Sequence, residues 1–465
     1  MIRNNKLHWS LMLVVLVGVL SACAAPAPQI VEVEKPVIVE KEVPVTIEVE
    51  KVVEVEKIVE VTPIPGKGVT LNVWLPPFVP DTKEQTEALL EPFEKATNIQ
   101  VDVTVIGWAD LQTMWVTAIQ ARETPDISYN YDSRIPDYFR IGALEPLDAY
   151  VDEEFMSRYL DEARRSAYHE GQLLALPAYV SSDVLFYNKE MFAQAGIEDP
   201  NDPMYSPTWE EFLEWNIKLT EAGFAGYDYG IRAIWDHPID DFFMRFGCTA
   251  TNADYTEITF DTPQCLKAAQ AWYDLAQTYD ALCEKCLTMD WSRGVAFQEG
   301  EAAMVPQRVA LAYQIQRDHP ELEGKWGIMR PFHDEMHKAY LGIGYFPVFE
   351  ASKHKQEAAT LLRYMSSDKF LVEWSRAMGG FPAVKAGAET YADAPPEIKQ
   401  ITDLTWYQLT SGDAKWFYPF VGFTRWATEV FVPNFHSLML GETTPEDFTT
   451  TVTEEGNKIL AEEQQ

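Results

Sequence analysis

The chain is short of positive charge. Its 465 residues include 37 lysines and arginines against 72 aspartates and glutamates, which gives a formal net charge of -35. Binding to a phosphate backbone depends on clustered lysine and arginine, so this imbalance excludes nucleic acid as a partner. Anionic lipid headgroups are disfavoured for the same reason. A neutral or positively charged partner is compatible with the composition.

Sequence signatures of catalysis are also missing. No GxSxG, Walker or GxGxxG pattern follows a predicted strand. Segment 333–337 (HDEMH) has two histidines, but it lacks the HExxH order and lies between two predicted strands, which favours a solvated turn over a zinc site. Carboxylates are too numerous in this acidic chain for a pair to indicate a glycosidase. We therefore expect no enzyme, no metal and no cofactor.

The N-terminus has an apolar run too short to cross a bilayer. Arg3 and Lys6 precede the run 11–20, and the small residues Ser21 and Ala22 lead to Cys23. This order resembles the bacterial lipobox, so we expect residues 1–22 to be a signal peptide and Cys23 to be diacylated. The mature chain would then lie on the extracytoplasmic face of the bacterial cell membrane, anchored by lipid. A plain signal peptide with an incidental cysteine is the alternative.

Residues 23–66 are predicted to form a stalk. Valine and isoleucine alternate there with glutamate and lysine, and the tetrapeptide EVEK occurs three times. Prolines interrupt the alternation, and the excess of glutamate makes the segment self-repelling and extended. The alternatives are an edge β-ribbon between copies of the chain and a short coiled coil, of which the coiled coil fits the spacing less well.

Cysteine is scarce, with five residues in the whole chain. Setting Cys23 aside leaves four cysteines, all within residues 248–286. An even number of cysteines in an exported chain favours two disulfides. Free thiols, a redox CxxC motif or half of a zinc site are the alternatives. Of the three pairings that are open, we expect Cys248 with Cys265 and Cys283 with Cys286.

The first part of the folded body alternates between strand and helix patterns. Strands are predicted at 69–74, 99–106 and 126–129, and helices at 82–97 and 111–121. This order favours a parallel α/β sheet, whose ligand sites lie at the carboxyl ends of its strands. About 400 residues follow the stalk, enough for two or three domains.

Eight motifs, in order along the chain, resemble one known family. It is the family 1 extracellular solute-binding proteins of ABC importers, the group that includes maltose-binding protein. The resemblance spans essentially residues 69–460. The motifs are LNVW at 71–74, TPDI at 124–127, GALEPL at 142–147, GQLLALP at 171–177, LFYNK at 185–189, PTWEEF at 207–212, AFQEGEAAM at 296–304 and SKHKQEAA at 352–359.

The resemblance implies a periplasmic-binding-protein-like α/β fold of the class II type, with the ligand in a cleft between two lobes. Such proteins deliver a small-molecule carbohydrate to ABC permease subunits in the membrane, and we expect a monomer. Gly342 and Gly344 can absorb rotation between the lobes at one of three chain crossings. We expect an N-lobe of residues 69–178 and 342–393, and a C-lobe of residues 179–341 and 394–465.

Residue types in the predicted loops favour a sugar as the ligand. Aromatic faces stack on the C–H faces of sugar rings, while carboxylates, arginines and amides bind the hydroxyls. Part of the aromatic set is expected to be core instead, and Trp209, Trp215, Trp272 and Trp374 fit helical core patterns. The predicted ligand-binding residues are Trp74, Phe78, Tyr131, Asp132, Arg134, Tyr179, Ser181, Asp183, Trp235, Asp236, Trp291, Arg308, Tyr345, Phe381, Trp416 and Arg425.

Three positions depart from the maltose binders. Ser181 stands where the resemblance implies a glutamate, and Arg308 and Arg425 stand where it implies tryptophans. Arginine in place of a stacking face favours a ligand with more hydroxyls, a carboxylate or a phosphate, such as glycerol-phosphate or uronic-acid types. A secreted glycan-binding adhesin or a glycoside hydrolase would share the aromatics and the stalk, and these are the rival classes.

Replacing Cys23 with serine tests the lipid anchor. Because Cys23 is the only acylation site that the sequence offers, the Cys23→Ser chain should be released into the medium or remain an unprocessed precursor. Membrane fractionation of cells that produce either form measures the difference. A processed variant that still sediments with the membranes would contradict the anchor.

Overall fold

The computed structural model describes residues 68–131, 135–169, 171–230, 238–288, 292–414 and 420–463. All of them fall in one compact unit of the chain. The predicted signal peptide, the stalk and Cys23 lie outside the described residues. Within the described ranges, none of the helices combines the length and the apolar character that crossing a membrane requires.

The first sheet has the predicted parallel order. Strand β1 (Thr70–Leu75) lies between β2 (Gln100–Val105) and β3 (Ile127–Ser128), with parallel pairing on both sides. Alternate residues of β1 are buried, because its apolar side chains point into the core of this domain. The crossover helices are α1 (Thr82–Thr97), which ends at Asn98 in the left-handed conformation, and α2 (Trp108–Ala121).

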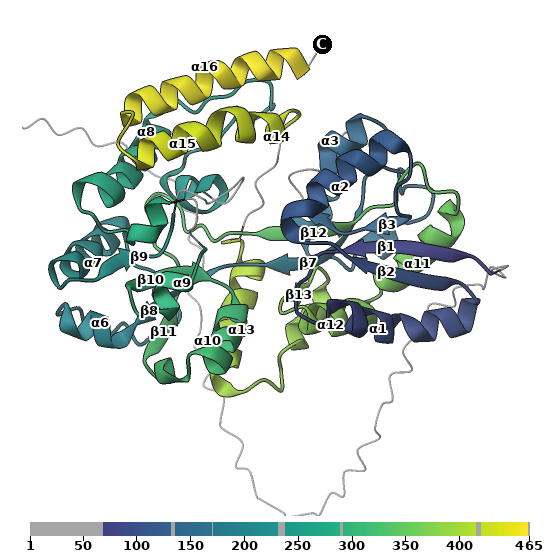
Figure 1. Cartoon of the computed structure of the whole chain (residues 1–465), viewed down its shortest axis with the longest axis horizontal. Helices are drawn as coiled ribbons and strands as arrows, with labels where there is room; N and C mark the ends of the chain where they lie inside the picture. The colour runs from purple at the N-terminus through teal and green to yellow at the C-terminus, as the bar shows by residue number, and fades with distance from the viewer. Residues whose placement is uncertain are drawn as a thin grey trace, which may run out of the picture. The chain divides into compact units, whose positions relative to one another are not determined.

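A second sheet carries the chain between two parts of the fold. Its order is β13 (Phe381–Pro382), β7 (Leu176–Ser181), β12 (Gly342–Phe346) and β4 (Asn130–Tyr131), and all the neighbouring pairs are antiparallel. All six residues of β7 are buried. Figure 1 shows β7 and β12 side by side, between the β1 sheet and a third sheet.

The third sheet forms the centre of the other domain. Its order is β11 (Trp326–Met329), β8 (Val184–Asn188), β10 (Ala302–Gln307) and β9 (Ala225–Tyr227). Strands β10 and β9 are parallel, whereas β8 is antiparallel to both of its neighbours. Strand β8 follows β7 of the second sheet directly in the chain, with no helix between them.

Helices cover these sheets, and short turns connect them. The remaining elements around the first sheet are α3 (Ile135–Arg140), α4 (Glu153–Met156), α5 (Asp161–Ser166), β5 (Tyr168–His169), β6 (Gln172–Leu173), α11 (Lys355–Met365), α12 (Asp368–Ala377) and η7 (Lys385–Glu389). The others are α6 (Lys189–Gln194), α7 (Trp209–Glu221), η2 (Pro238–Phe242), η3 (Phe243–Phe246), α8 (Pro263–Tyr273), η4 (Asp274–Thr278), η5 (Glu284–Leu287), α9 (Val295–Gln298), α10 (Val309–Asp318), η6 (Pro320–Leu322), α13 (Pro396–Ser411), α14 (Phe423–Trp426), η8 (Ala427–Phe431), α15 (Val432–Met439) and α16 (Pro445–Glu463).

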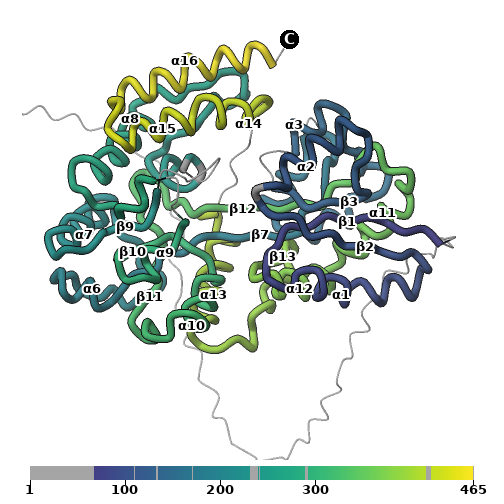
Figure 2. Tube along the Cα trace, viewed as in Figure 1, coloured from purple at the N-terminus to yellow at the C-terminus, as the bar shows by residue number. Residues whose placement is uncertain are grey.

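Segments far apart in the sequence share each hydrophobic core. One core joins residues 71–180 with residues from 339 onward, so that α1 packs on α12, as Figure 2 shows. Another joins residues 185–332 with residues 420–460, where α16 packs on α8. Trp272 and Trp374 are fully buried, which confirms that they are core tryptophans. Trp272 stacks on Phe242 with ring centroids 4.0 Å apart.

The glycines of β12 are explained by packing rather than by backbone freedom. A side chain at Gly344 would collide with the ring of Tyr129, and one at Gly342 would meet the Tyr340 hydroxyl at 2.7 Å. Both residues are paired within the sheet, opposite Tyr179 and Ser181. Close approach of a neighbouring ring is therefore what requires glycine at these positions.

Segment 333–337 is a partly exposed turn between β11 and β12, as predicted. The rings of His333 and His337 stack with centroids 3.9 Å apart. Nδ1 of His333 lies 3.0 Å from the hydroxyl of Ser206, which ties the turn to the segment before α7. The stacked pair and its serine partner give the turn a structural role.

The four cysteines of the folded body form the two expected disulfides, Cys248 with Cys265 and Cys283 with Cys286. All four cysteines are buried. The first bridge joins the loop after η3 to the first turn of α8, whose N-cap Thr262 accepts a hydrogen bond from the amide of Cys265. That cap places the start of α8 at Pro263.

Thiol titration tests the two bridges. A fragment that begins at Val69 should contain no thiol reactive under denaturing, non-reducing conditions, and reduction should release four. Each bridge is expected to contribute about 2 to 4 kcal/mol to the free energy of unfolding. Reactive thiols in freshly exported protein, before any reductant is added, would contradict the pairing.

Candidate functional site

Aromatic side chains gather where the strands of the first sheet end. Phe78 follows β1, Trp108 opens α2 after β2, and Tyr131 ends β4 just after β3. The rings of Trp108 and Tyr131 stack with centroids 5.4 Å apart and an interplanar angle of 25°. Phe78 packs edge-on against Trp108 at 5.2 Å. We refer to Phe78, Trp108 and Tyr131 as the aromatic cluster.

The aromatic cluster is partly exposed, although a buried layer supports it. Trp108 is 39% exposed, whereas Tyr129 and Trp374, which both contact Phe78, are fully buried. The indole N–H of Trp108 donates to the carbonyl of Pro77 at 3.3 Å, which fixes the orientation of the ring. A flat, oriented and partly exposed aromatic surface is thus placed at the carboxyl edge of a parallel sheet.

A buried carboxylate lies two residues beyond the end of β7. Asp183 is fully buried, and two arginines share it. Arg293 donates from Nη1 to Oδ2 at 2.6 Å, and Arg308 donates from Nε to Oδ1 at 3.2 Å. The arginine side chains keep 16% and 21% of their surface exposed. We refer to Asp183, Arg293 and Arg308 as the ion cluster.

Arg308 connects the ion cluster to several tyrosines. Its guanidinium lies over the ring of Tyr340, 5.4 Å from the centroid. Burial raises the pKa of Tyr179, and the nearby guanidinium of Arg308 opposes that shift. Burial disfavours the charged form of Arg308, but Asp183 outweighs this and, with Tyr340, Tyr179 and Tyr131, holds its pKa well above the usual value. Arg308 therefore stays charged and lies within electrostatic reach of the aromatic cluster.

A second buried pair lies beside the ion cluster. Arg245 and Asp241 form an ion pair one turn apart, and both are about 1% exposed. Burial raises the pKa of Asp241, and Arg245 opposes that shift. The Nε of Arg245 also donates to the carbonyl of Lys338 at 3.1 Å, and its guanidinium lies over the ring of Phe332. These contacts anchor the segment that leads to Tyr340.

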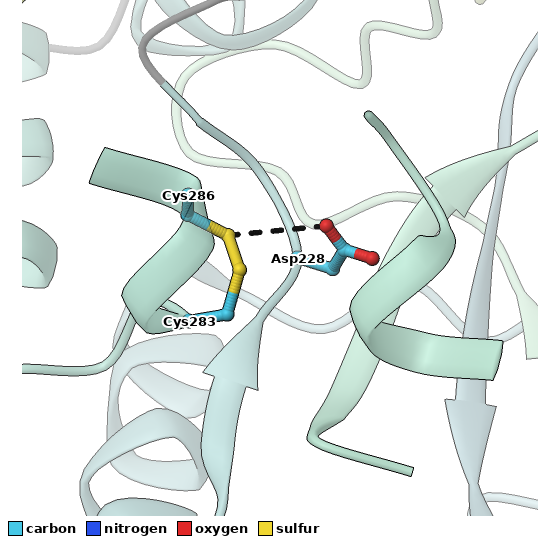
Figure 3. Close-up of side chains that lie close together, drawn as sticks. All are labelled: Asp228, Cys283 and Cys286. Carbon is cyan, nitrogen blue, oxygen red and sulfur yellow. Dashed lines mark hydrogen bonds between the residues drawn. A yellow bond between two sulfur atoms is a disulfide. The ribbon is translucent and has the colours of Figure 1, made fainter. Parts of the chain in front are cut away.

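Asp228 positions the loop that carries Arg293. It follows β9, and its Oδ2 accepts hydrogen bonds from the amides of Gly294 and Phe297 at 3.0 and 3.1 Å, at the start of α9. Its Oδ1 lies 3.9 Å from the sulfur of Cys286, as Figure 3 shows. The carboxylate thus fixes the backbone immediately after Arg293.

Among the described residues, only Asp228, Cys283 and Cys286 form a group of three whose spacing could hold a metal ion. Both sulfurs are joined in a disulfide, which removes the thiolates that a soft metal would need. One carboxylate oxygen is taken by two backbone amides. The group therefore fits a structural role in the fold.

The predicted ligand-binding residues fall into three groups. The structure brings together Phe78, Tyr131, Tyr179, Asp183 and Arg308. Others lie apart from these five in the described contacts: Trp74 in β1, Ser181 at the end of β7, Tyr345 against Ser166, Phe381 against Trp406, and Arg425 with Glu429 and Glu462. Asp132, Arg134, Trp235, Asp236, Trp291 and Trp416 lie outside the described residues.

Three members of the site were missed by the sequence analysis. Trp108 directly follows the predicted strand 99–106, so its position at a strand end was a usable signal. Arg293 lies two residues from Trp291, which had been singled out as a loop aromatic. Tyr340 lies next to a predicted chain crossing, in a mostly apolar run that gives no sign of a site.

These features define a two-domain α/β protein with a polar and aromatic site beside the strands that connect the domains. The family model described as bacterial extracellular solute-binding protein matches residues 79–370. Since this match covers more than half of the chain, the protein belongs to the family of bacterial extracellular solute-binding proteins.

Similarity to individual relatives is low in identity, and the share of the chain that it covers differs between them. A binding protein of Brucella abortus is 24% identical over 321 residues, which are 67% of this chain and 74% of the relative. The diacetylchitobiose-binding protein DasA of Streptomyces coelicolor is 28% identical over 132 residues, which are 28% of this chain and 31% of the relative. Both are named as binding proteins, not as enzymes.

Solved structures confirm the two-domain fold. An oligosaccharide periplasmic-binding protein of Synechococcus has a TM-score of 0.75 at 18% identity, over 84% of this chain and 99% of that one. A solute-binding protein of Thermotoga lettingae bound to α-D-tagatose has a TM-score of 0.68 at 23% identity, over 84% and 100%.

Replacing Asp183 with asparagine tests the ion cluster. Two partly buried arginines would lose their shared charge, so the free energy of unfolding should fall by about 3 to 5 kcal/mol. Asp318→Asn is the matched control, because Asp318 pairs with Arg317 on the surface and its loss should leave stability nearly unchanged. Chemical denaturation measures both variants, and equal stabilities would contradict the role of Asp183.

Proposed function

We propose that this protein is a lipid-anchored solute-binding protein that captures a carbohydrate between two closing lobes and delivers it to an ABC permease. The observation that carries the proposal is the Trp108–Tyr131 stack, which lies within electrostatic reach of Arg308 at the carboxyl edge of the first sheet. Family membership supports the binding role, and the residues of the site support the class of ligand.

The chemistry of the site suits a sugar ring. Trp108 and Tyr131 offer flat faces to the apolar C–H surface of a ring, and Phe78 supports them from the side. Arg293, Arg308 and the tyrosine hydroxyls offer donors for ring hydroxyls. Relatives named for diacetylchitobiose, arabinooligosaccharides and maltotriose support the same class of ligand for this chain.

Contacts on another side of the fold support closure of the lobes. We place the N-lobe at residues 69–178 and 342–393 and the C-lobe at 179–341 and 394–465. In these terms Arg140 of α3 pairs with Glu463 of α16 across the lobes at 2.5 Å. Asp137 of α3 accepts a hydrogen bond from the amide of Gly422 at 3.2 Å, just before α14. These contacts would form when the lobes close and break when they open.

Further features of the proposal come from the sequence. Cys23 supplies the anchor, residues 23–66 the spacer, and the body acts as a monomer without enzymatic activity. Asp132, Arg134, Trp235, Asp236, Trp291 and Trp416 stay predicted ligand contacts, as do Trp74, Ser181, Tyr345, Phe381 and Arg425. The site, not the fold alone, carries the assignment, because one fold hosts many functions.

A thermal-shift screen against monosaccharides, oligosaccharides and polyols tests the proposal. A ligand at 1,000 times its dissociation constant should add about 4 kcal/mol to the free energy of unfolding. Recovery of the ligand unchanged after incubation would separate a binder from a glycoside hydrolase. No stabilisation by any carbohydrate would refute the proposal, and turnover would favour the enzyme.

Two tryptophans that belong to the same helix form a matched pair of variants. Trp108→Ala should weaken sugar binding by about 1 to 3 kcal/mol and leave the melting temperature of the empty protein nearly unchanged, because Trp108 is 39% exposed. Trp115→Ala should instead lower stability by about 3 to 5 kcal/mol, since Trp115 is fully buried and donates to Ser128. Calorimetry with the sugar that stabilises most measures affinity, and normal binding by Trp108→Ala would contradict the placement of the site.

A further inference from the structure

We propose that the carbohydrate bound by this protein carries an anionic group, a carboxylate or a phosphate, and that Arg293 and Arg308 bind it. The inference rests on the proposed function and narrows its ligand class from sugars in general to acidic sugars. It comes from the charges of the ion cluster, their burial and the donors that remain.

The ion cluster holds two cations and one anion. Asp183 accepts one hydrogen bond from each arginine, at 2.6 and 3.2 Å, so its two oxygens are divided between them. One carboxylate neutralises one guanidinium, and both arginines stay protonated at any physiological pH. The cluster therefore retains a net positive charge next to the aromatic cluster.

Neighbouring described carboxylates are committed to other partners. Asp241 of η2 forms an ion pair with Arg245 of η3. Asp228 uses Oδ2 to accept two backbone amides at the start of α9. Within the described ranges, the ion pairs formed by Arg293 and Arg308 are both with Asp183. Asp183 is thus the described carboxylate that pairs directly with both arginines, while the charge of Asp241 also acts on Arg293.

The exposure of the three side chains leaves the arginines accessible. Asp183 is fully buried, whereas Arg293 and Arg308 keep 16% and 21% of their side-chain surface. Each guanidinium has five N–H donors, of which Asp183 engages one, and Arg308 also hydrogen-bonds to Tyr179. The forked donor geometry of arginine matches a carboxylate or a phosphate in a bidentate contact. Asp183 thus fixes the arginines from behind while their other donors can meet a ligand.

The positive charge of the ion cluster contrasts with the charge of the whole chain. With a formal net charge of -35, the protein repels anions at long range, so a concentrated positive charge is unusual for it. A partly buried guanidinium without a full counter-charge is costly, and an anionic ligand would remove that cost. A neutral sugar would hydrogen-bond to the arginines but leave the excess charge in place. The site should therefore bind acidic sugars more tightly than neutral ones.

Pairs of sugars that differ only in the anionic group test the inference on the full mature protein. Glucose is compared with glucuronate and with glucose 6-phosphate, and neutral oligosaccharides are compared with oligouronates of equal length, by calorimetry. The acidic member of a pair should bind about tenfold tighter or more, as expected for charge-assisted hydrogen bonds. Preference for glucuronate assigns a carboxylate, and preference for glucose 6-phosphate assigns a phosphate.

Variants then connect the preference to the ion cluster. Arg308→Gln should abolish most of the preference, and Arg308→Lys should restore part of it, because the charge returns without the fork. Arg317→Gln is the matched control, since Arg317 lies on the surface and pairs with Asp318. Circular dichroism of each variant checks folding, while the comparison of sugars on the unmodified protein does not depend on any variant.

The outcomes separate this inference from the proposed function. Neutral sugars that bind as tightly as their acidic partners would overturn the inference and leave the proposed function standing. A preference for acids that survives in Arg308→Gln would overturn the assigned residue. No binding of any sugar, acidic or neutral, would refute the proposed function and this inference with it.

Discussion

The pairing of β7 with β12 is the constraint on which the rest of the structure depends. These two strands pair from Gly342 opposite Ser181 to Phe346 opposite Leu176, with one shift of register between Gly344 and Tyr345. The side chains of both strands are buried, and the ring of Tyr129 occupies the space where Gly344 would otherwise have a side chain. The pairing therefore has one register, because a slip by one residue would place a side chain against that ring.

The register of this pair also sets the position of the site. Tyr179 lies within β7, and Asp183 follows the end of the strand by two residues, so both are placed by the sheet rather than by a loop. Arg308 follows β10 directly, and Arg293 precedes the α9 turn that Asp228 holds. Three separate segments thus meet at one carboxylate, each fixed by regular structure. A binding site built in this way is rigid within each domain, so changes on binding are expected between the domains.

The sequence predicted the fold better than the site, for physical reasons. Alternation of buried and exposed residues in β1 and the helical spacing in α1 are periodic signals, so the parallel sheet was predicted correctly. The two disulfides were expected for another reason, the even number of cysteines in an exported chain, and their pairing was one of three that the sequence left open. Strands β7, β8 and β12 are buried on both faces and have no alternation, so the pattern does not show which of their residues face a ligand. Arg293 and Arg308 lie 110 and 125 residues from Asp183 in the chain, and only tertiary structure brings them to that carboxylate.

Distance measurement between the two lobes tests the central claim most directly. Spin labels at Glu91 on α1 and Glu214 on α7 sit on exposed helix surfaces of the two proposed lobes. Double electron–electron resonance on the full mature protein measures the distance between the labels in the empty state and in the state saturated by the most stabilising sugar. A second pair within the N-lobe, Glu91 and Glu350, serves as the control. Closure around a sugar predicts a shorter distance between the lobes and an unchanged control distance, and an identical distribution in both states, with sugar binding confirmed, would contradict it.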